Sequence, residues 1–344
     1  MMMKDNDNLQ GYSLMFVIVN QGKGSKILHC ISEMGICGAA AFYGRGTVPN
    51  HILKFFELAD IRKEVVMVAM PARDEQKILD TLIAKFSLDR PNKGIIFTLP
   101  LSAVYGRGHH YQGPAFCPRE GTPWQAVMTV VDKGNTDKVL DYVDDHGFPR
   151  GTVIDAHGSA DKSNKFFNLM FESEKDLLLM VTPREQASPL ADLLTDHLNL
   201  NQPNSGILAL FNLHQAAGIT LPSQESGFAP GPIKGCGGYS AIFVIIENDK
   251  DEAVIQSAER AGSTGGTIIH ARSICPYYGK NFLSHGVEEE REIIFIIAED
   301  EKTQAICQRV SDDLGLGSEG TGKGIILVAP LCSVIGLAPE IIDK

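Results

Sequence analysis

The chain lacks several features that would assign it to a protein class at once, beginning with an excess of positive charge. Its 344 residues include 31 Lys and Arg against 42 Asp and Glu, which gives a formal net charge of −11. Binding to a phosphate backbone or to an anionic membrane surface needs a positive footprint. The composition therefore argues against a nucleic-acid partner.

Long apolar runs and paired cysteines are also missing. No run approaches the roughly 18 apolar residues of a membrane span, and the opening MMMKDNDNLQ has no apolar core of signal-peptide length. The seven cysteines include no CxxC spacing, which suits reduced, buried thiols better than a disulfide framework. We expect a cytoplasmic protein that does not insert into a membrane.

What the chain contains is one unit written three times. The three stretches align from an aromatic residue to a glycine, and Gly35, Gly147 and Gly262 fall in register. Self-similarity of this kind points to a repeat architecture. The predicted divisions are an N-terminal tail (1–11), a first unit (12–106), a linker (107–123), a second unit (124–218), a linker (219–238), a third unit (239–336) and a C-terminal tail (337–344).

Within one unit, the hydrophobic pattern alternates between strand and helix. In the first unit the predicted elements are strands at 14–19, 39–43, 65–70 and 94–99, with helices at 27–34 and 78–86. The order β-α-β-β-α-β is that of the ferredoxin-like plait, an antiparallel sheet with both helices on one face. In the second unit, Ser188 and Pro189 are predicted as the N-cap and first residue of the second helix.

The predicted strands are apolar on both sides, as in LMFVIV, VVMVAM and GIIFTL of the first unit. A lone plait leaves one sheet face wet, and its strands should alternate apolar with polar residues. An exposed face this apolar would be larger than soluble monomers normally carry. We therefore expect an α+β fold of three tandem ferredoxin-like domains whose open faces pack together as a trimer within one chain. The alternative is three separate domains, each covered by another molecule.

These features resemble the PII nitrogen-regulatory family. Residues 38–46 and 265–272 look like the second strand of that family entering its long loop, and 93–100 and 320–327 look like its phosphate-side turn and last strand. The resemblance implies a PII-like pseudo-trimer with adenine nucleotides in three lateral clefts and a mobile loop that docks on transporters or enzymes. The chain departs from the family where Gly106, Gly218 and Gly336 replace the first of two arginines after the last strand.

Ligand-site candidates recur in two places. Arg45, His157 and Arg272 fall at equivalent positions where the second strand enters its loop, which indicates an anionic ligand. GSEGTGKG (317–324) lacks the final hydroxyl residue of a P-loop and precedes a strand, but its glycine amides could still form an anion-binding nest. The full set of candidates for nucleotide or anion binding is Arg45, Asn92, Lys93, Gly94, His157, Ser205, Gly206, Arg272, Gly320, Gly322, Lys323 and Gly324.

The resemblance and the sites together lead to a functional hypothesis. We expect a PII-like signalling protein that senses a small anionic effector, such as ATP, ADP or another adenine nucleotide, and regulates a partner protein. The partner would dock on the loops at 47–61, 159–174 and 273–290, with Tyr277, Tyr278 and Lys280 as contact candidates in the third loop. By resemblance, that partner could be a membrane transporter.

Three other classes of function compete with this hypothesis. A ligand-independent scaffold that retains the trimer architecture is favoured by the missing arginines. A metal-binding trimer of the copper-tolerance type is weaker, because no ligand cluster repeats across the units. No Ser/His/Asp or Cys/His set recurs at one position either, so we do not expect an enzyme.

Overall fold

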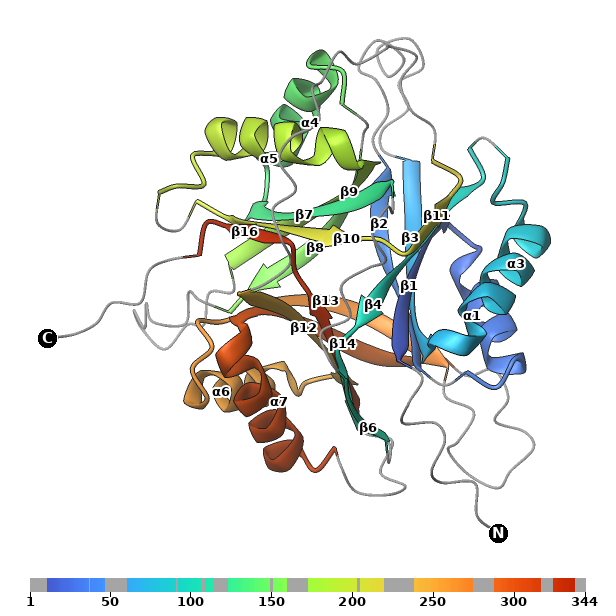
Figure 1. Ribbon diagram of the computed structural model, residues 1–344, viewed down its shortest axis with the longest axis vertical. Helices are drawn as coiled ribbons and strands as arrows, with labels where there is room; N and C mark the ends of the chain where they lie inside the picture. The colour runs from blue at the N-terminus through green and yellow to red at the C-terminus, as the bar shows by residue number, and fades with distance from the viewer. Residues whose placement is uncertain are drawn as a thin grey trace, which may run out of the picture.

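The computed structural model describes most of the chain as a mixed α+β protein with one large antiparallel sheet (Figure 1). The described residues are 11–36, 38–46, 61–90, 92–106, 109–113, 123–148, 151–159, 173–202, 205–219, 238–274, 288–316 and 324–337. Within them lie six α-helices and a sheet of 16 strands. No helix in these ranges combines the length and the apolar character needed to cross a membrane.

Each third of the described chain follows the predicted order of elements. The first unit consists of β1 (Tyr12–Asn20), α1 (Gly24–Glu33), β2 (Gly38–Gly46), β3 (Ile61–Pro71), the short 3-10 turn η2 (Ala72–Asp74), α3 (Glu75–Phe86) and β4 (Gly94–Leu101). The second consists of β7 (Trp124–Asp132), α4 (Thr136–Asp145), β8 (Thr152–Gly158), β9 (Ser173–Pro183), α5 (Arg184–Leu198) and β10 (Ile207–Asn212). The third consists of β12 (Tyr239–Glu247), α6 (Asp251–Arg260), β13 (Thr267–Ile274), β14 (Glu288–Glu299), α7 (Asp300–Leu314) and β15 (Gly324–Pro330).

The strands of each unit pair in the same order and register. The first strand lies between the fourth and the third, and the second strand flanks the third. Phe16 of β1, for example, is opposite Phe97 of β4 and Met67 of β3, and the aligned Phe243 of β12 is opposite Leu327 and Phe295. This antiparallel order is what the β-α-β-β-α-β pattern predicts.

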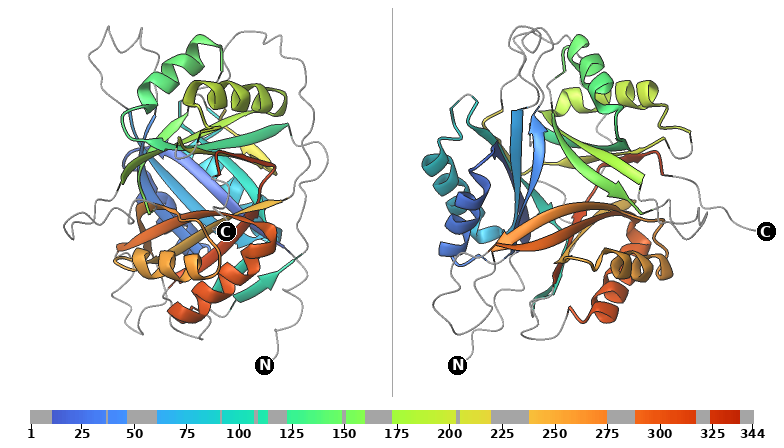
Figure 2. Two further views of the ribbon diagram at one scale, coloured as in Figure 1. Left: turned by 90° about the vertical axis from the view of Figure 1, so that its left-hand side faces the viewer. Right: turned by 180° about the vertical axis from the view of Figure 1, so that it is seen from behind.

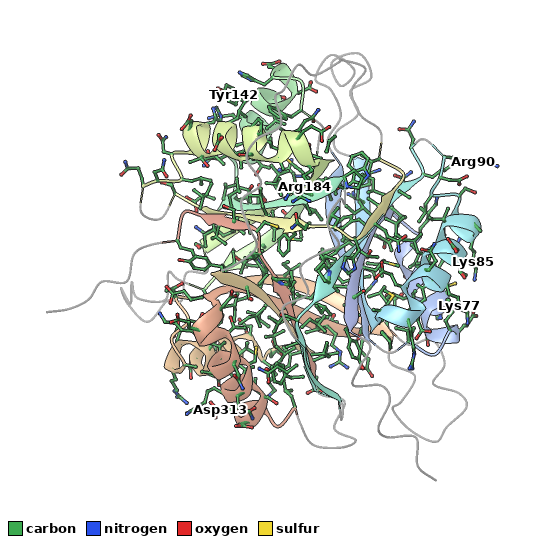
Figure 3. The ribbon with its side chains drawn as sticks, viewed as in Figure 1. Lys77, Lys85, Arg90, Tyr142, Arg184 and Asp313 are labelled. Atoms are coloured by element: carbon green, nitrogen blue, oxygen red, sulfur yellow. The ribbon has the colours of Figure 1, made fainter. Side chains whose placement is uncertain are left out.

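The helices cover the outer face of the strands. Figures 1 and 2 show three helix pairs on the outside and the strands between them. Alternate strand residues such as Met15, Val17 and Val66 pack under α1 and α3, because successive side chains point to opposite faces. Charged and polar side chains such as Lys77, Lys85 and Asp313 point away from the strands (Figure 3).

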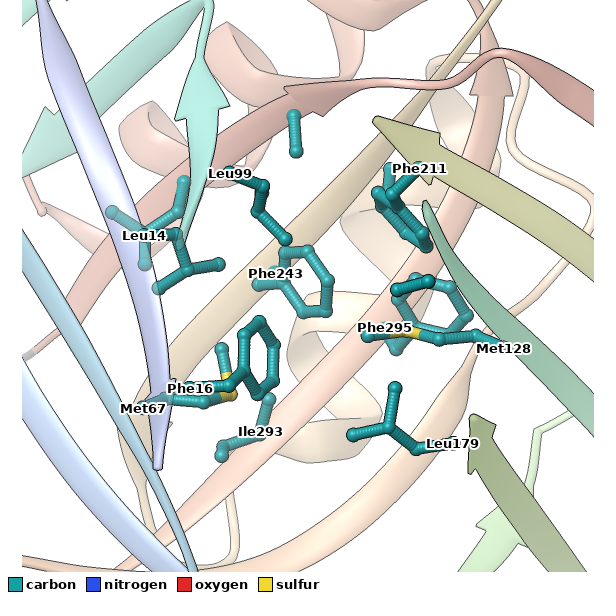
Figure 4. Close-up of a cluster of buried hydrophobic side chains, with 14 of the residues drawn as sticks. Leu14, Phe16, Met67, Leu99, Met128, Leu179, Phe211, Phe243, Ile293 and Phe295 are labelled. Atoms are coloured by element: carbon teal, nitrogen blue, oxygen red, sulfur yellow. The ribbon is translucent and has the colours of Figure 1, made fainter. Parts of the chain in front are cut away.

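The inner faces of the strands form one shared hydrophobic core. Its buried residues come from all three units and include Phe16, Phe211, Phe243 and Phe295 (Figure 4). The Phe16 ring stacks on Phe97 at 5.1 Å between centroids and meets Phe243 of the third unit edge-on at 6.4 Å. The apolar character of both strand faces is therefore accounted for by burial within the chain.

A short strand near the end of each unit pairs with a strand of another unit. β5 (Ala103–Gly106) pairs with β15, β11 (Gln215–Ala217) with β4, and β16 (Ser333–Ile335) with β10. A further strand, β6 (His109–Gln112), pairs with β5 inside the predicted first linker. The hydrophobic pattern does not predict these strands, because three or four residues are too few to show the alternation of a strand.

The predicted start of the second helix in the second unit is wrong. Ser188 and Pro189 lie inside α5, which begins at Arg184, directly after the strand that ends at Pro183. The Arg184 amide donates to the Pro123 carbonyl at 2.8 Å, so the helix starts where the preceding strand ends. Pro189 therefore lies beyond the first turn, where proline fits freely, and it does not mark the first residue of the helix.

Candidate functional site

The three units meet at seams, each formed where the second strand of one unit lies on the second strand of another. β2 lies on β8, β8 on β13 and β13 on β2, so the contacts close a ring. The aligned residues Arg45, His157 and Arg272 are paired there with Val153, Ile268 and Ala41, respectively. We name the β2–β8 contact seam 1–2, the β8–β13 contact seam 2–3 and the β13–β2 contact seam 3–1, after the units that they join. Three of the predicted ligand residues therefore lie at three equivalent places.

At seam 3–1, Arg272 is held by two carboxylates. Its guanidinium is 2.5 Å from Glu64 Oε1 of the first unit and 2.6 Å from Glu288 Oε2 of its own unit. The same group lies 4.7 Å from the centroid of the Tyr43 ring, a cation–π distance. The charge of Arg272 is thus balanced by the protein itself.

At seam 1–2, Arg45 makes the corresponding contact. Its guanidinium is 3.5 Å from Asp176 Oδ2 of the second unit, a side chain that is fully buried. Asp176 also accepts a short hydrogen bond from Thr136 Oγ1 at the start of α4. Asp176 and Glu64 occupy aligned positions on β9 and β3. An external anion at Arg45 or Arg272 would have to compete with these carboxylates.

The buried carboxylates also satisfy the first turns of helices. Glu64 Oε2 accepts hydrogen bonds from the backbone amides of Lys23 at 2.9 Å and Gly24 at 2.6 Å, where α1 begins. The N-terminus of a helix attracts negative charge because its first amides have no partner in the helix and its dipole is positive there. The protein therefore places its own anion at this position.

Seam 2–3 differs because histidines replace arginine. His157 of β8 and His270 of β13 have ring centroids 5.4 Å apart. His270 Nδ1 lies 4.0 Å from Oε1 of Glu292, which is aligned with Glu64 and Asp176. Burial raises the pKa of Glu292, and the Asp251 carboxylate raises it further, while the amides of Lys250 and Asp251 and the His270 side chain offset part of the shift.

A second aligned set of cations precedes the buried carboxylates. Lys63 Nζ donates to Asn20 Oδ1 at 2.6 Å, Lys175 forms an ion pair with Asp132, and Arg291 lies 4.0 Å from Glu247. Burial lowers the pKa of Lys63, and the nearby Lys23 ammonium lowers it further. These residues are not among the ligand-site candidates predicted from the sequence. Their signal is a base followed by an acid in all three units: Lys63-Glu64, Lys175-Asp176 and Arg291-Glu292.

A pocket opens at seam 3–1. It is shallow, with a cavity volume of about 10 Å³, enough for about one water molecule, and its lining comes from the first and third units. The first unit contributes Gly38 and Ala39, while the third contributes the cation Arg291 and the hydroxyl of Ser273. The remaining lining residues are Ile245, Gly324 and Ile325. Arg291 Nε donates to Ser273 Oγ at 3.2 Å, and the guanidinium also pairs with Glu289.

The predicted turn residues lie beside the last strands. Asn92 and Lys93 are exposed, and Asn92 adopts a left-handed φ of 61°. Ser205 and Gly206 are half-buried before β10, and Gly324 is buried at the start of β15 and borders the pocket. Gly320, Gly322 and Lys323 lie outside the described residues, as do the loop candidates Tyr277, Tyr278 and Lys280.

The glycines at the ends of the three units pack on neighbouring units. A Cβ at Gly218 would be 2.2 Å from the Gly94 carbonyl oxygen, and one at Gly336 would be 2.2 Å from that of Gly206. A Cβ at Gly106 would be 2.7 Å from the Gly324 carbonyl oxygen. No side chain fits at these contacts, so each of these positions requires glycine.

One buried polar cluster occurs in the first unit. Glu75 accepts hydrogen bonds from Ser13, from Thr98 at 2.8 Å and from Gln215 at 3.0 Å, and lies 3.5 Å from His214 Nδ1. Burial acts to raise the pKa of Glu75, but the hydrogen bonds of His214, Ser13 and Thr98 outweigh it and lower the pKa. Because the carboxylate lies between Ser13 and His214, the imidazole is not placed to activate the serine. The cluster anchors the segment leading into β11 on the first unit.

In the described part of the chain we find neither a metal site nor an exposed reactive cysteine. No group of three or more His, Cys, Asp or Glu is arranged there to hold a metal ion. Cys30, Cys307 and Cys332 are buried and unbridged, and burial raises the pKa of Cys307 to about 12. These thiols are core residues, as the sequence analysis predicts.

Comparisons with known proteins assign no family. No model of a known protein family matches the chain, and neither does any curated protein. Among solved structures, an aspartate kinase from Synechocystis aligns with 94% of this chain at 12% identity and a TM-score of 0.21. An anthrone oxidase-like protein aligns with 63% of the chain and 95% of its own length at 10% identity and a TM-score of 0.18. The chain spans about half the length, 52%, of the aspartate kinase.

Proposed function

We propose that this protein is a single-chain regulatory protein of PII-like architecture, in which three ferredoxin-like units act as a pseudo-trimer. It senses a small anionic ligand of the adenine-nucleotide class and signals to a partner protein of the nitrogen-regulation type, for example a transporter. The ligand binds at seam 3–1, and the loop between β13 and β14 carries the response. The protein acts by binding and not by catalysis.

The pocket at seam 3–1 is the observation that carries this proposal. It lies between two units, combines the Arg291 guanidinium with the Ser273 hydroxyl, and borders Gly324, the last residue of the glycine-rich segment 317–324. Apolar Ile245 and Ile325 complete the lining. Apolar walls with a few placed polar groups are typical of small-molecule sites, and because the cavity is only about 10 Å³, a nucleotide has to widen the seam to bind.

The response follows from the position of the pocket. Ser273 and Arg291, which line it, flank the segment 275–287 between β13 and β14. A ligand shifts a conformational equilibrium only if it binds the two states unequally. A ligand that contacts both ends of this segment meets that condition, since its contacts depend on how the segment is held.

Calorimetric titration of the purified chain with ATP, ADP, AMP and cyclic AMP tests the proposal. We expect binding at the seam 3–1 pocket, where Arg291 and the Ser273 hydroxyl lie together, and a ligand phosphate would compete there with Glu289 for Arg291. Lys323→Gln should weaken binding by about tenfold, the effect of losing one charge-assisted contact. Lys93→Gln, the matched change in the exposed turn of the first unit, should leave the affinity unchanged. The absence of heat with every nucleotide would exclude this ligand class.

A ligand-independent scaffold is the second candidate. It is supported by the carboxylates that neutralise Arg45 and Arg272 and by the glycine contacts that close over Gly94, Gly206 and Gly324. In that case amide exchange in β13, β14 and β15 would be identical with and without nucleotide, and Lys323→Gln would change nothing.

A further inference from the structure

One position distinguishes the three seams chemically. The aligned residues at the ends of the second strands are Arg45, Arg272 and His157. At two seams a guanidinium contacts the buried carboxylate of the neighbouring unit, Asp176 or Glu64. A guanidinium stays protonated at every accessible pH, so these two contacts do not depend on pH in the neutral range.

Seam 2–3 has an imidazole at that position and a second imidazole beside it. His157 and His270 come from different units, and their rings are 5.4 Å apart. The aligned carboxylate, Glu292, is 4% exposed and lies 4.0 Å from His270 Nδ1. Seam 2–3 therefore has a buried carboxylate at the same aligned position as the other two seams, but it has histidines where they have arginine.

Glu292 is held less tightly by its helix than Glu64 is. The amides of Lys250 and Asp251 donate to Glu292 Oε2 at 3.3 and 3.2 Å, whereas those at Glu64 are 2.9 and 2.6 Å away. The Asp251 carboxylate at the start of α6 adds repulsion. The ionised Glu292 therefore depends more on a nearby cation than Glu64 does.

The other charged groups around the imidazoles lie on the β8 side of seam 2–3. Glu174 of β9 is opposite His157 in the strand register, and Lys175 lies against Gly158. Lys133 lies 3.6 Å from Asp155 and 3.7 Å from Glu174, so one exposed cation faces two carboxylates and a net negative charge remains on this side. From β14, Glu292 is the carboxylate that faces His270.

We propose that seam 2–3 is a proton-sensitive contact, in which protonation of the His157–His270 pair supplies the cation that arginine supplies permanently at the other two seams. Imidazole side chains ordinarily gain a proton between about pH 5 and 8. In the lower part of that range, where Glu292 is ionised, the imidazolium faces its carboxylate and the seam is closed by charge. Above it the carboxylate loses the counter-charge that the imidazoles supply, and the seam opens more often.

Glu292 makes a separate contribution of the same sign. A carboxyl group whose pKa is raised on folding contributes stability that is present below its ordinary value of 4.5 and is lost as the pH rises through the folded value. That contribution comes from the neutral carboxyl group, whereas the contact with the imidazolium requires the ionised one, so the two act in different parts of the pH range. The effect is modest, because His270 is 66% exposed and solvent screens its charge.

Hydrogen–deuterium exchange read at the strands of each seam tests the proposal. After correction for the intrinsic exchange rate, opening at β8 and the start of β13 should increase about threefold between pH 6 and pH 8, relative to β2, the strand paired at both guanidinium seams. His157→Arg should remove the pH dependence and keep the seam protected at pH 8. His270→Gln should remove the dependence and leave the seam open at both pH values.

A control variant and a folding check complete the experiment. His29→Gln changes an exposed histidine on α1 and should retain the wild-type pH response. Exchange in β1 and β12, which lie in the shared core, reports whether each variant is folded. The proposal is overturned if all seams respond equally to pH, or if His157→Arg and His270→Gln keep the wild-type response.

Discussion

Gly218 and its counterparts show how a single residue decides the contact between two units. At Gly218 the backbone adopts a φ of +77°, which side chains disfavour, and the Gly94 carbonyl oxygen occupies the place of a Cβ. The contact recurs at Gly106 and Gly336. The ends of the units therefore contact the neighbouring unit through backbone atoms, and there is no room for a side chain at these contacts.

Gly218→Ala should destabilise the protein by about 2–4 kcal/mol, because an unfavourable φ adds to a steric clash with backbone. Gly22→Ala is the matched control: its φ is +86°, but no atom lies within 4 Å of the place that the alanine methyl would take. The control should cost only about 1 kcal/mol. Urea unfolding followed by circular dichroism measures both, and equal losses would mean that the contact with Gly94 does not matter.

The recurrence of the acidic seam residues can be seen in the sequence, but their burial and their partners cannot. Arg45, His157 and Arg272 stand out because they recur at strand ends. Glu64 follows Lys63 at the beginning of an apolar strand and looks like an ordinary solvated charge. Its burial depends on its contacts with the N-terminus of α1 and with Arg272 of the third unit, and both contacts arise from the tertiary structure.

At the scale of the element, the seam strands differ in how firmly their arginines are held. Arg272 on β13 contacts Glu64 at 2.5 Å and Glu288 at 2.6 Å, whereas the contact of Arg45 on β2 with Asp176 is longer, at 3.5 Å. Removing one partner of a buried ion pair leaves an uncompensated charge. The two seams should therefore respond unequally to the same substitution.

Arg272→Met should lower the free energy of unfolding by about 2–4 kcal/mol, and Arg45→Met by about 1–2 kcal/mol. Arg309→Met removes an exposed pair with Asp313 on α7 and should cost no more than about 0.5 kcal/mol. Denaturant titration at neutral pH compares the three variants. A larger loss for Arg45→Met than for Arg272→Met would contradict the contacts described at seam 3–1.

The order of the long elements could be predicted from the sequence, but the short strands could not. Apolar runs such as 14–19 and 65–70 are long enough to show that they are strands. β11 and β16 have three residues each and form because another unit presents an open strand edge. The early start of α5 has a similar cause, since it follows from where β9 ends and not from Pro189.

At the scale of the whole molecule, the shared core should make the three units unfold together. Phe243 of the third unit contacts Phe16 of the first, and the same core includes Met128 of the second. The apolar pattern on both strand faces predicts that something must cover them, but it does not say which side chains meet. That choice depends on how the three sheets are oriented, which no local pattern records.

Phe243→Ala should cost about 3–5 kcal/mol and shift a single unfolding transition. The single tryptophan of the chain, Trp124, lies in the second unit and provides a distant probe. Its fluorescence midpoint should move with the far-ultraviolet circular dichroism signal, although the substitution lies in the third unit. If the fluorescence midpoint stayed fixed while the dichroism signal became biphasic, the units would be independent.

The closed ring of strand contacts has a consequence for how such a protein can change. An assembly of three identical subunits repeats any substitution at every interface, so its contacts must remain alike. Here one polypeptide supplies Arg45, His157 and Arg272 separately. Each junction can therefore acquire its own chemistry by a single mutation, and the molecule can respond at one side while the other two hold it together.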